Sequence, residues 1–360
     1  MNEIGSDFHI VNTEKNIEVN IFRYLKTFHT QFYDSGRSAL KALLTHIPAK
    51  RVLLPGYICE SVRNCFNTNE VFYYKINKEM KICWKDVLNK AKNNIDIVYL
   101  HFFNGYIDAS YNFEELIELQ KIYKFLIIED TTHSLFTNKN TVGDYCVCSL
   151  RKWFPVPDGG VLYSAKNKLP LKCLEQNEWF SVRYKAMQLK TMYLTGKQID
   201  KEDFLAIFAE SEKALDEQEN IYRLSNISKK LLEKIDVKKM INARCRNAEY
   251  LNDYFRKTHI KNVSMGQNGQ VPLFYTLLVQ NRDDIRKMLI DNKIYCPVHW
   301  PLYSEIENIS SSIYINLHEL SIPIDQRYSY GDMQYIADIF RKWEGTNDST
   351  YKLERKRKME

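Results

Sequence analysis

The chain has 360 residues, of which 44% are hydrophobic and 13% aromatic. This length and composition are typical of a globular protein with a substantial core, so they exclude disorder across the main body and allow one large domain with a smaller partner. Basic residues number 51 against 45 acidic ones, and the resulting net charge of +6 is too small to indicate a nucleic-acid binder.

Cysteine usage and the N-terminal segment indicate the compartment. Eight cysteines lie scattered along the chain without paired CxxC motifs, so we expect reduced thiols and no structural zinc or other metal site. The opening residues, MNEIGSDFHIVNTEKN, lack a basic region followed by an apolar run, which argues against a signal peptide. No apolar stretch approaches the roughly 20 residues that span a bilayer. We therefore expect a cytoplasmic protein that does not bind membranes.

Strand-like and helix-like segments alternate through the first half of the chain. Several of the strand-like runs are apolar on both faces, as a parallel sheet covered by helices requires. This alternation predicts an α/β domain with right-handed crossovers. The expected strands are 51–54, 71–76, 95–102, 124–130, 145–150 and 160–164, and the helices between them include 38–47 and 112–123.

The second half is first helical and then returns to an α/β pattern. One long amphipathic stretch is expected over 220–255 within a charged helical region of about 170–256. We predict a large domain over 1–240, a smaller C-terminal α/β domain over 241–345 and a charged, disordered tail over 346–360, for which binding an anionic partner is the alternative. Within the small domain we expect a strand at 271–280, a helix at 283–293, a strand and turn at 294–301 and a closing helix at 331–343.

Three motifs carry candidate chemistry, and each alone has an ordinary structural explanation. In DSGRSAL, the small residues Ser35 and Gly36 and the cation Arg37 begin a helix, where free backbone N–H groups bind phosphate. The same pattern is also that of a simple N-cap. In IIEDTTHS, Asp130 follows an apolar strand and needs a cationic partner if it is buried, and His133 comes three residues later. The alternative is a turn-capping aspartate with a surface histidine.

The third motif is SLRKWFPVPDGG. Ser149 ends a strand, Lys152 follows, and the glycines at 159 and 160 open the next strand. A lysine amine becomes a nucleophile near neutral pH when burial and nearby cations lower its pKa. Among 51 basic residues, a lysine taken by itself is far more often solvated.

Taken in order, the three motifs resemble the DegT–StrS family of fold type I pyridoxal 5'-phosphate (PLP) enzymes, best known as nucleotide-sugar aminotransferases. The resemblance covers about residues 20–343, and LLPGY (53–57), HFFNG (101–105) and NRDDIRKMLIDNKI (281–294) agree with it in order. It implies a large domain with a mostly parallel central sheet between helices, plus a smaller C-terminal α/β domain. It also implies a homodimer with both active sites at the interface.

The resemblance assigns a role to each motif residue. Lys152 would form an imine with PLP, Asp130 would pair with the pyridine nitrogen, and His133 would lie near the phenolic oxygen. The cofactor phosphate would be bound by Gly36, Arg37 and Ser149.

The chain also departs from the family pattern. Ser149 and Lys152 are closer together than in many members, and Arg37 replaces a common threonine and would strengthen phosphate binding. Cys59 stands where an aromatic residue usually stacks on the ring, so Tyr57 and Phe103 are the candidates for stacking. The asparagine that members often lend to the partner subunit has its nearest equivalent in Asn220, one position away from the expected place.

Two later segments give weaker signals. His299 and Trp300 end a strand in the small domain and could line the substrate entrance, with core packing as the alternative. Phe103 is also a candidate for contact with the substrate. The polar and aromatic loop at 324–332 is interpreted as a structural turn.

We therefore predict an aminotransferase that takes an amino group from an amino acid, by resemblance L-glutamate. It gives this group to a nucleotide-linked keto-sugar in surface polysaccharide or secondary-metabolite biosynthesis. The presence of Lys152 disfavours the family's lysine-lacking dehydratases. The alternatives are a PLP aminotransferase with a non-sugar keto substrate and a catalytically silent protein of this fold that binds or regulates.

Overall fold

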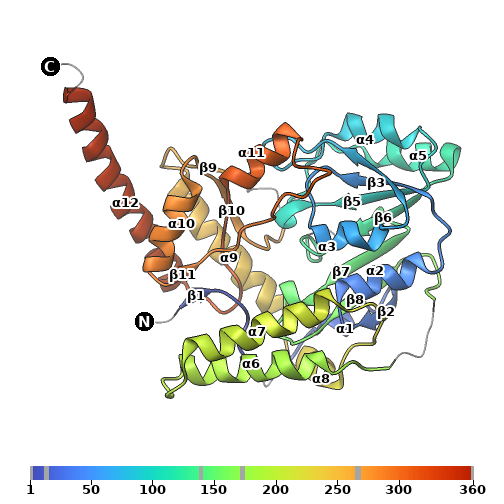
Figure 1. Ribbon diagram of the computed structural model, residues 1–360, viewed down its shortest axis with the longest axis horizontal. Helices are drawn as coiled ribbons and strands as arrows, with labels where there is room; N and C mark the ends of the chain where they lie inside the picture. The colour runs from blue at the N-terminus through green and yellow to red at the C-terminus, as the bar shows by residue number, and fades with distance from the viewer. Residues whose placement is uncertain (1–2, 12–15, 138–140, 171–174, 264–268, 358–360) are drawn as a thin grey trace.

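The computed structural model describes residues 3–11, 16–137, 141–170, 175–263 and 269–357, with side chains as far as Glu344. The chain forms a larger unit around a seven-stranded sheet and a smaller unit formed mainly by the C-terminal third, with the helix pair α6 and α7 alongside both (Figure 1).

The central sheet has the strand order β2-β8-β7-β6-β5-β3-β4. Strand β8 is antiparallel to both of its neighbours, and β7, β6, β5, β3 and β4 run parallel to one another. All six strands expected in the first half are present, and this sheet covered by helices is the predicted α/β architecture. The strands are β2 (His29–Tyr33), β3 (Arg51–Pro55), β4 (Glu70–Tyr74), β5 (Ile97–His101), β6 (Leu126–Asp130), β7 (Tyr145–Ser149) and β8 (Gly160–Ser164).

Strand β2 was not predicted, and its position at the edge of the sheet explains why. It begins with the polar sequence HTQ and is only partly buried, so it lacks the continuous apolar run that marks the central strands.

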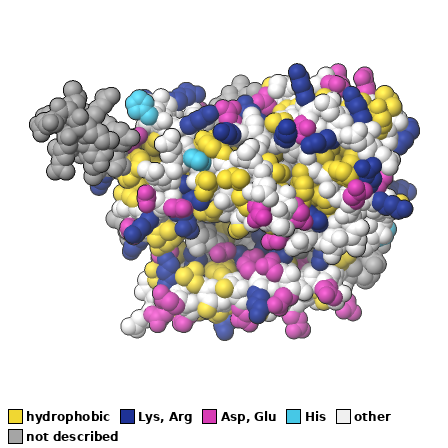
Figure 2. Space-filling model, turned by 45° about the horizontal axis from the view of Figure 1, so that its top comes forward, with side chains coloured by type: hydrophobic (Ala, Val, Ile, Leu, Met, Phe, Trp, Pro, Cys, Tyr) yellow, Lys and Arg dark blue, Asp and Glu magenta, His cyan; other side chains and the backbone are white. Residues whose placement is uncertain are grey.

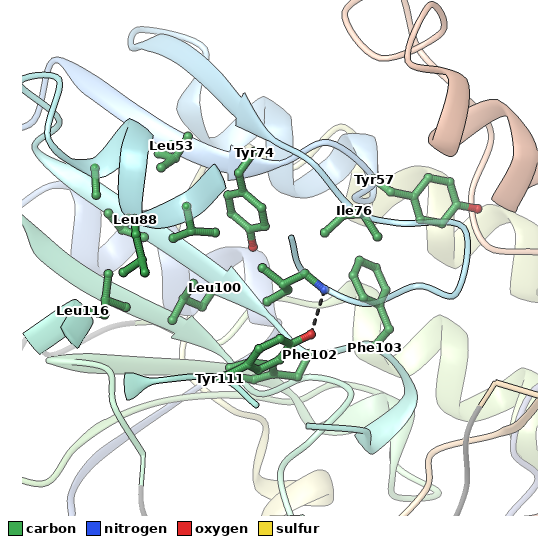
Figure 3. Packing of buried hydrophobic residues seen from close by; sticks show 14 of the residues in the cluster. Leu53, Tyr57, Tyr74, Ile76, Leu88, Leu100, Phe102, Phe103, Tyr111 and Leu116 are labelled. Carbon is green, nitrogen blue, oxygen red and sulfur yellow. Dashed lines mark hydrogen bonds between the residues drawn. The ribbon is translucent and has the colours of Figure 1, made fainter. Parts of the chain in front are cut away.

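Helices cover both faces of the sheet, and successive residues of one strand serve the two faces. In β3, Val52 and Leu54 pack with Leu40 of α2, whereas Leu53 packs with Leu116 of α5 on the opposite side. Figure 3 shows the second of these clusters between the sheet and the two helices α4 and α5. The covering helices are α2 (Gly36–Leu44), the short α3 (Glu60–Arg63), α4 (Trp84–Ala91) and α5 (Phe113–Tyr123).

The C-terminal unit has its own sheet and its own core. Strands in the order β12-β10-β9 form an antiparallel sheet, and Leu251, Leu289 and Phe340 belong to the cluster packed on it. Strand β1 near the N-terminus pairs in parallel with β11, so the first described residues join this unit. The elements are β1 (Ile4–Gly5), β9 (Lys261–Asn262), β10 (Tyr275–Leu278), α10 (Arg282–Asp291), β11 (Ile294–Tyr295), α11 (Ser310–His318), β12 (Glu319–Ile322) and α12 (Tyr330–Arg357).

The region expected to contain one long amphipathic stretch is divided, which corrects that expectation. Helix α8 (Asn226–Leu232) ends before Asp236, and α9 (Val237–Phe255) begins after it. The Asp236 carboxylate accepts hydrogen bonds from the backbone N–H groups of Lys238 and Lys239, which makes it the N-cap of a new helix. The remaining α-helices of the described residues precede α8 in the chain and are α1 (Ile21–Tyr24), α6 (Trp179–Leu194) and α7 (Lys201–Asp216).

The described residues contain neither a membrane-spanning helix nor a cluster of metal-ligating side chains. No helix among them is long and apolar enough to cross a membrane. No three histidine, cysteine, aspartate or glutamate side chains in the described ranges gather closely enough to hold a metal ion. The domain boundaries at 240 and 345 stay predictions. So does the disorder of 346–360, although helix α12 continues along the backbone as far as Arg357.

Candidate active site

A cavity of about 590 Å³ opens at the carboxyl ends of the central strands, where open α/β sheets bind ligands. Figure 2 shows this face of the molecule hollowed across its middle, with acidic side chains beside the hollow. The lining comes from α2, the start of α3, the ends of β5, β6 and β7, helix α7 and the segment after β11. Among its members are Gly36, Arg37, Cys59, His101, Asp130, Thr132, His133, Ser149, Arg151, Lys152, Glu212, Asp216 and Trp300.

Asp130 lies at the floor of this cavity, at the last position of β6. It is buried, with 4% of its surface exposed, and it pairs in register with His101 of β5. The Asp130 Oδ2 atom lies 3.0 Å from His101 Nδ1, and Oδ1 accepts from the Thr132 backbone N–H at 2.9 Å. Burial acts to raise the pKa of Asp130, but His101 and Thr132 bring it below the usual value. The site therefore contains a buried carboxylate that stays ionised.

His133 lines the cavity beside Asp130. Its Nδ1 accepts a hydrogen bond from the backbone N–H of Asn104 at 3.3 Å. Burial, with added effects from the charges of His101 and His299, lowers the pKa of His133 well below its ordinary value. The imidazole is therefore neutral near pH 7.

Lys152 ends the short turn of 3-10 helix Leu150–Lys152 that follows β7. Its side chain borders the cavity and is exposed there, and it has no hydrogen bond or ion pair with any residue that the structure describes. Surrounding protein lowers the pKa of the amine by desolvation, an effect that Cys59 opposes and Arg151 reinforces. A lysine with these properties suits nucleophilic and proton-transfer chemistry.

The start of α2 forms one wall, and close backbone contacts hold it in place. A Cβ atom added to Gly36 would lie 3.1 Å from Ser149 Cβ at the end of β7. One added to Gly160 would lie 2.1 Å from the Ser35 carbonyl oxygen. Ser35 caps α2 by accepting from the Ser38 N–H at 3.0 Å. The glycines at 36 and 160 thus let the helix start approach the ends of two strands, where its free N–H groups can bind an anion.

Helix α7 supplies acidic side chains to the opposite wall. Asp216 forms an ion pair with Arg37 at 2.6 Å. One turn earlier, Glu212 contacts Arg151 at 2.7 Å and also pairs with Arg183 of α6. Burial acts to raise the pKa of Glu212, but the two guanidinium groups lower it to about 2. The cavity therefore combines cations from the large unit with carboxylates from α7.

The structure gathers most of the predicted site residues but separates three of them. Tyr57, Phe103 and His299 are buried and are not among the residues that line the cavity. Figure 3 shows Tyr57 and Phe103 at the edge of the hydrophobic cluster. Their rings lie 5.5 and 6.2 Å from that of Trp300, which does line the cavity.

A stacking role for Tyr57 or Phe103 is not supported by these positions. Tyr57 is held instead by the peptide after His299, because its hydroxyl donates to the His299 carbonyl and accepts from the Trp300 N–H. Its side chain therefore supports Trp300 from behind the cavity wall.

Three neighbours of the site were not predicted as site residues. His101 belongs to the HFFNG segment, and a histidine ending an apolar strand beside the Asp130 strand was a signal in the sequence. Glu212 and Asp216 lie in an ordinary amphipathic helix, and nothing local to them indicates that α7 reaches the cavity.

Two further residues or segments named in the sequence analysis can be located in the structure. Asn220 donates to the Tyr222 hydroxyl at 3.5 Å and does not line the cavity of its own chain. In the loop 324–332, the Gln326 side chain donates to the Trp153 carbonyl at 2.8 Å. This contact joins the loop to the segment after Lys152, which agrees with a structural role.

Comparison with solved structures identifies the architecture. A DegT DnrJ EryC1 StrS aminotransferase from Brucella abortus is 16% identical, with a TM-score of 0.64 over 90% of this chain and 88% of that one. The sugar aminotransferase CalS13 from Micromonospora echinospora is 14% identical, with a TM-score of 0.63 over 87% of each chain. Spr1654 from Streptococcus pneumoniae, in its PLP-form, is 12% identical, with a TM-score of 0.64 over 94% and 98%.

The chain has their fold. The predicted fold type I architecture is therefore confirmed. Neither the scan against protein-family models nor the search of curated proteins found a match.

Proposed function

We propose that this protein is a PLP-dependent aminotransferase that acts on a keto-sugar. One observation carries the proposal: Lys152, with a lowered pKa and no hydrogen bond or ion pair among the described residues, shares a cavity with the buried, ionised Asp130. This pair sits at the strand ends of a fold that the sugar aminotransferase CalS13 and the PLP-form of Spr1654 share.

The residues present fit PLP at both of its charged ends. Asp130 offers a carboxylate to a protonated ring nitrogen. At the start of α2, Gly36 leaves space that a Cβ atom would fill, and Arg37 and Ser149 line the same cavity. Backbone N–H groups and a guanidinium group would therefore be available there to bind the phosphate. Lys152 and His133 also line the cavity, where the amine and the imidazole are available to the aldehyde and the phenolic oxygen. Cys59 borders the cavity without offering an aromatic face.

When bound, PLP supplies an electron sink that stabilises negative charge on the amino-acid carbon. Lys152 would hold the cofactor through Nζ and, once released by the incoming amine, would carry a proton at that nitrogen as general acid and base. Its lowered pKa favours this role near neutral pH. Asp130 would keep a negative charge available to the ring nitrogen, and Trp300 lines the cavity from the segment after β11.

The proposed amino donor is L-glutamate, and the proposed acceptor is a keto-sugar linked to a nucleotide diphosphate. Arg37 and Lys41 lie along the same wall of the cavity and suit anionic ligands. We further propose a homodimer with residues of both subunits at each site. Such an enzyme would serve surface polysaccharide or secondary-metabolite biosynthesis.

Borohydride treatment of the PLP-loaded protein, followed by peptide mapping, tests the proposal. Reduction should leave the cofactor fixed to the peptide that contains Lys152, and a Lys166→Ala control should label equally, because Lys166 is an exposed lysine beyond the next strand. A label that is absent or attached to another lysine would refute the proposed role.

Incubation with L-glutamate then separates catalysis from binding alone. Release of 2-oxoglutarate with a change in cofactor absorbance supports an aminotransferase, whereas no spectral change favours a catalytically silent protein. Nucleotide-linked keto-sugars tested against simple keto acids as acceptors distinguish the proposed substrate from a non-sugar one.

A further inference from the structure

The loop after β5 adopts an unusual backbone conformation at the edge of the site. Asn104 has φ 52° and ψ 22°, and Gly105, which follows it, has φ 86°. The left-handed region is disfavoured for residues with a Cβ, and asparagine tolerates it better than most. This conformation directs the Asn104 backbone N–H to His133 Nδ1, 3.3 Å away.

Contacts from three directions hold Asn104 in this conformation. Its side-chain Nδ2 donates to Thr276 Oγ1 of β10 at 2.6 Å, and its carbonyl accepts from the Leu273 N–H at 3.1 Å. The neighbouring Gly105 carbonyl accepts from Thr137 Oγ1 at 2.7 Å. Only 1% of the Asn104 surface is exposed. The C-terminal unit thus fixes a loop of the large unit against His133.

The contact determines which nitrogen of His133 carries the proton. A neutral imidazole has one N–H, and a ring nitrogen that accepts a hydrogen bond cannot also carry that proton. Because His133 Nδ1 accepts from Asn104, the proton belongs on Nε2. His133 lines the cavity, and Nε2 is the nitrogen left for a ligand.

His101 gives a useful contrast within the same cluster. Its Nδ1 lies 3.0 Å from the Asp130 carboxylate, which can only accept, so the proton of His101 belongs on Nδ1. The two adjacent rings, with centroids 4.7 Å apart, therefore differ at Nδ1, which carries a proton in His101 and accepts a hydrogen bond in His133.

We propose that Asn104 is a positioning residue that fixes the Nε2–H tautomer of His133, so that His133 donates a hydrogen bond to an anionic oxygen bound above Asp130. This deepens the proposed function, in which that oxygen is the phenolic oxygen of PLP. The tautomer itself is a property of the cofactor-free chain.

Long-range ¹H–¹⁵N spectra of ¹⁵N-histidine-labelled, cofactor-free protein test the inference, with His133 assigned by a His133→Gln variant. Wild-type His133 should show a proton on Nε2 only, and Asn104→Gly, which keeps the backbone N–H and the left-handed conformation, should show the same. Both variants lose the side-chain contact with Thr276, but in Asn104→Ala strain at positive φ should also release the loop, so a signal for the Nδ1–H tautomer should appear.

Titration of the same proteins with PLP, followed by absorbance, measures the effect on cofactor binding. Asn104→Ala should bind PLP up to about tenfold more weakly than Asn104→Gly, the range expected from one hydrogen bond. A proton on Nδ1 of wild-type His133, or an unchanged tautomer in Asn104→Ala, would overturn the role of Asn104. If PLP does not bind at all while the tautomers behave as expected, the proposed function fails and the positioning of His133 stands.

Discussion

The floor of the cavity and its α7 wall are held together by different kinds of interaction. The floor comes from the ends of adjacent strands, where Asp130 and its neighbours are buried and hydrogen-bonded. The α7 wall consists of ion pairs between residues far apart in the chain, and Asp216 remains 64% exposed in its pair with Arg37. Buried polar groups depend strongly on their partners, whereas exposed ion pairs contribute little. We therefore expect changes in the floor to have large effects and changes in the wall to have small ones.

The largest expected effect is that of Lys152→Ala. Removal of the amine should lower the rate of amino transfer by at least 10²- to 10⁴-fold, the range that a positioned acid–base group contributes. Single-turnover rates of 2-oxoglutarate formation from L-glutamate measure this, with Lys166→Ala as the control. Retention of more than a tenth of wild-type activity in Lys152→Ala would place the chemistry elsewhere.

The pH dependence of stability gives a test outside the cavity lining, through Asp158, which is buried in the turn before β8. Burial raises the pKa of this carboxyl from 3.8 to about 6, although hydrogen bonds from Ser225 and Ser228 oppose the shift. Because the folded-state pKa is the higher one, Asp158 stabilises the fold fully below about pH 4, and this contribution is lost as the pH rises through about 6.

Comparison with Asp158→Asn, which stays neutral, isolates this contribution from those of other carboxylates. The unfolding free energy of the wild type minus that of the variant should fall by up to about 3 kcal/mol between pH 4 and pH 7. Urea denaturation at both pH values gives the two differences. A difference that rises with pH would mean that Asp158 is ionised at little cost in the folded protein.

Gly160→Ala probes the contact between β8 and the start of α2. The added Cβ would lie 2.1 Å from the Ser35 carbonyl oxygen, so the backbone must move, at a cost of about 1–3 kcal/mol. Thermal denaturation should show the loss, and binding of PLP should weaken with it. Gly331→Ala is the matched control, since its Cβ would meet only Ser329 Oγ at 3.7 Å. Equal stability of the two variants would contradict the close packing inferred here.

Asp216→Asn should have the smallest effect. Loss of this exposed pair with Arg37 should change the unfolding free energy by less than about 1 kcal/mol. Because Arg37 is then free for an anion, PLP should bind slightly more tightly, by no more than a few-fold. Titration at two salt concentrations measures this. A loss of binding larger than tenfold would show that α7 belongs to the essential part of the site.

Local sequence determined the floor and most of the sheet. Apolar runs identify the central strands, because both faces of a parallel sheet must be apolar. Asp130 and Lys152 lie at or just after the ends of such runs, and strand ends lie at one edge of the sheet. The order of the three motifs, rather than either residue alone, made the two residues predictable. The left-handed conformation of Asn104 and the break at Asp236 have no comparably clear signal, since each depends on hydrogen bonds chosen by the fold.

Only the tertiary structure decided what faces the floor. Glu212 and Asp216 reach the cavity because α7 packs alongside it. Tyr57 lies outside the cavity lining because its hydroxyl is hydrogen-bonded to the peptide between His299 and Trp300. Sequence specifies which side chains follow a strand, since that relation is local. Arg37 and Asp216 are 179 residues apart and Arg151 and Glu212 are 61 apart, and packing alone brings these partners together at the cavity.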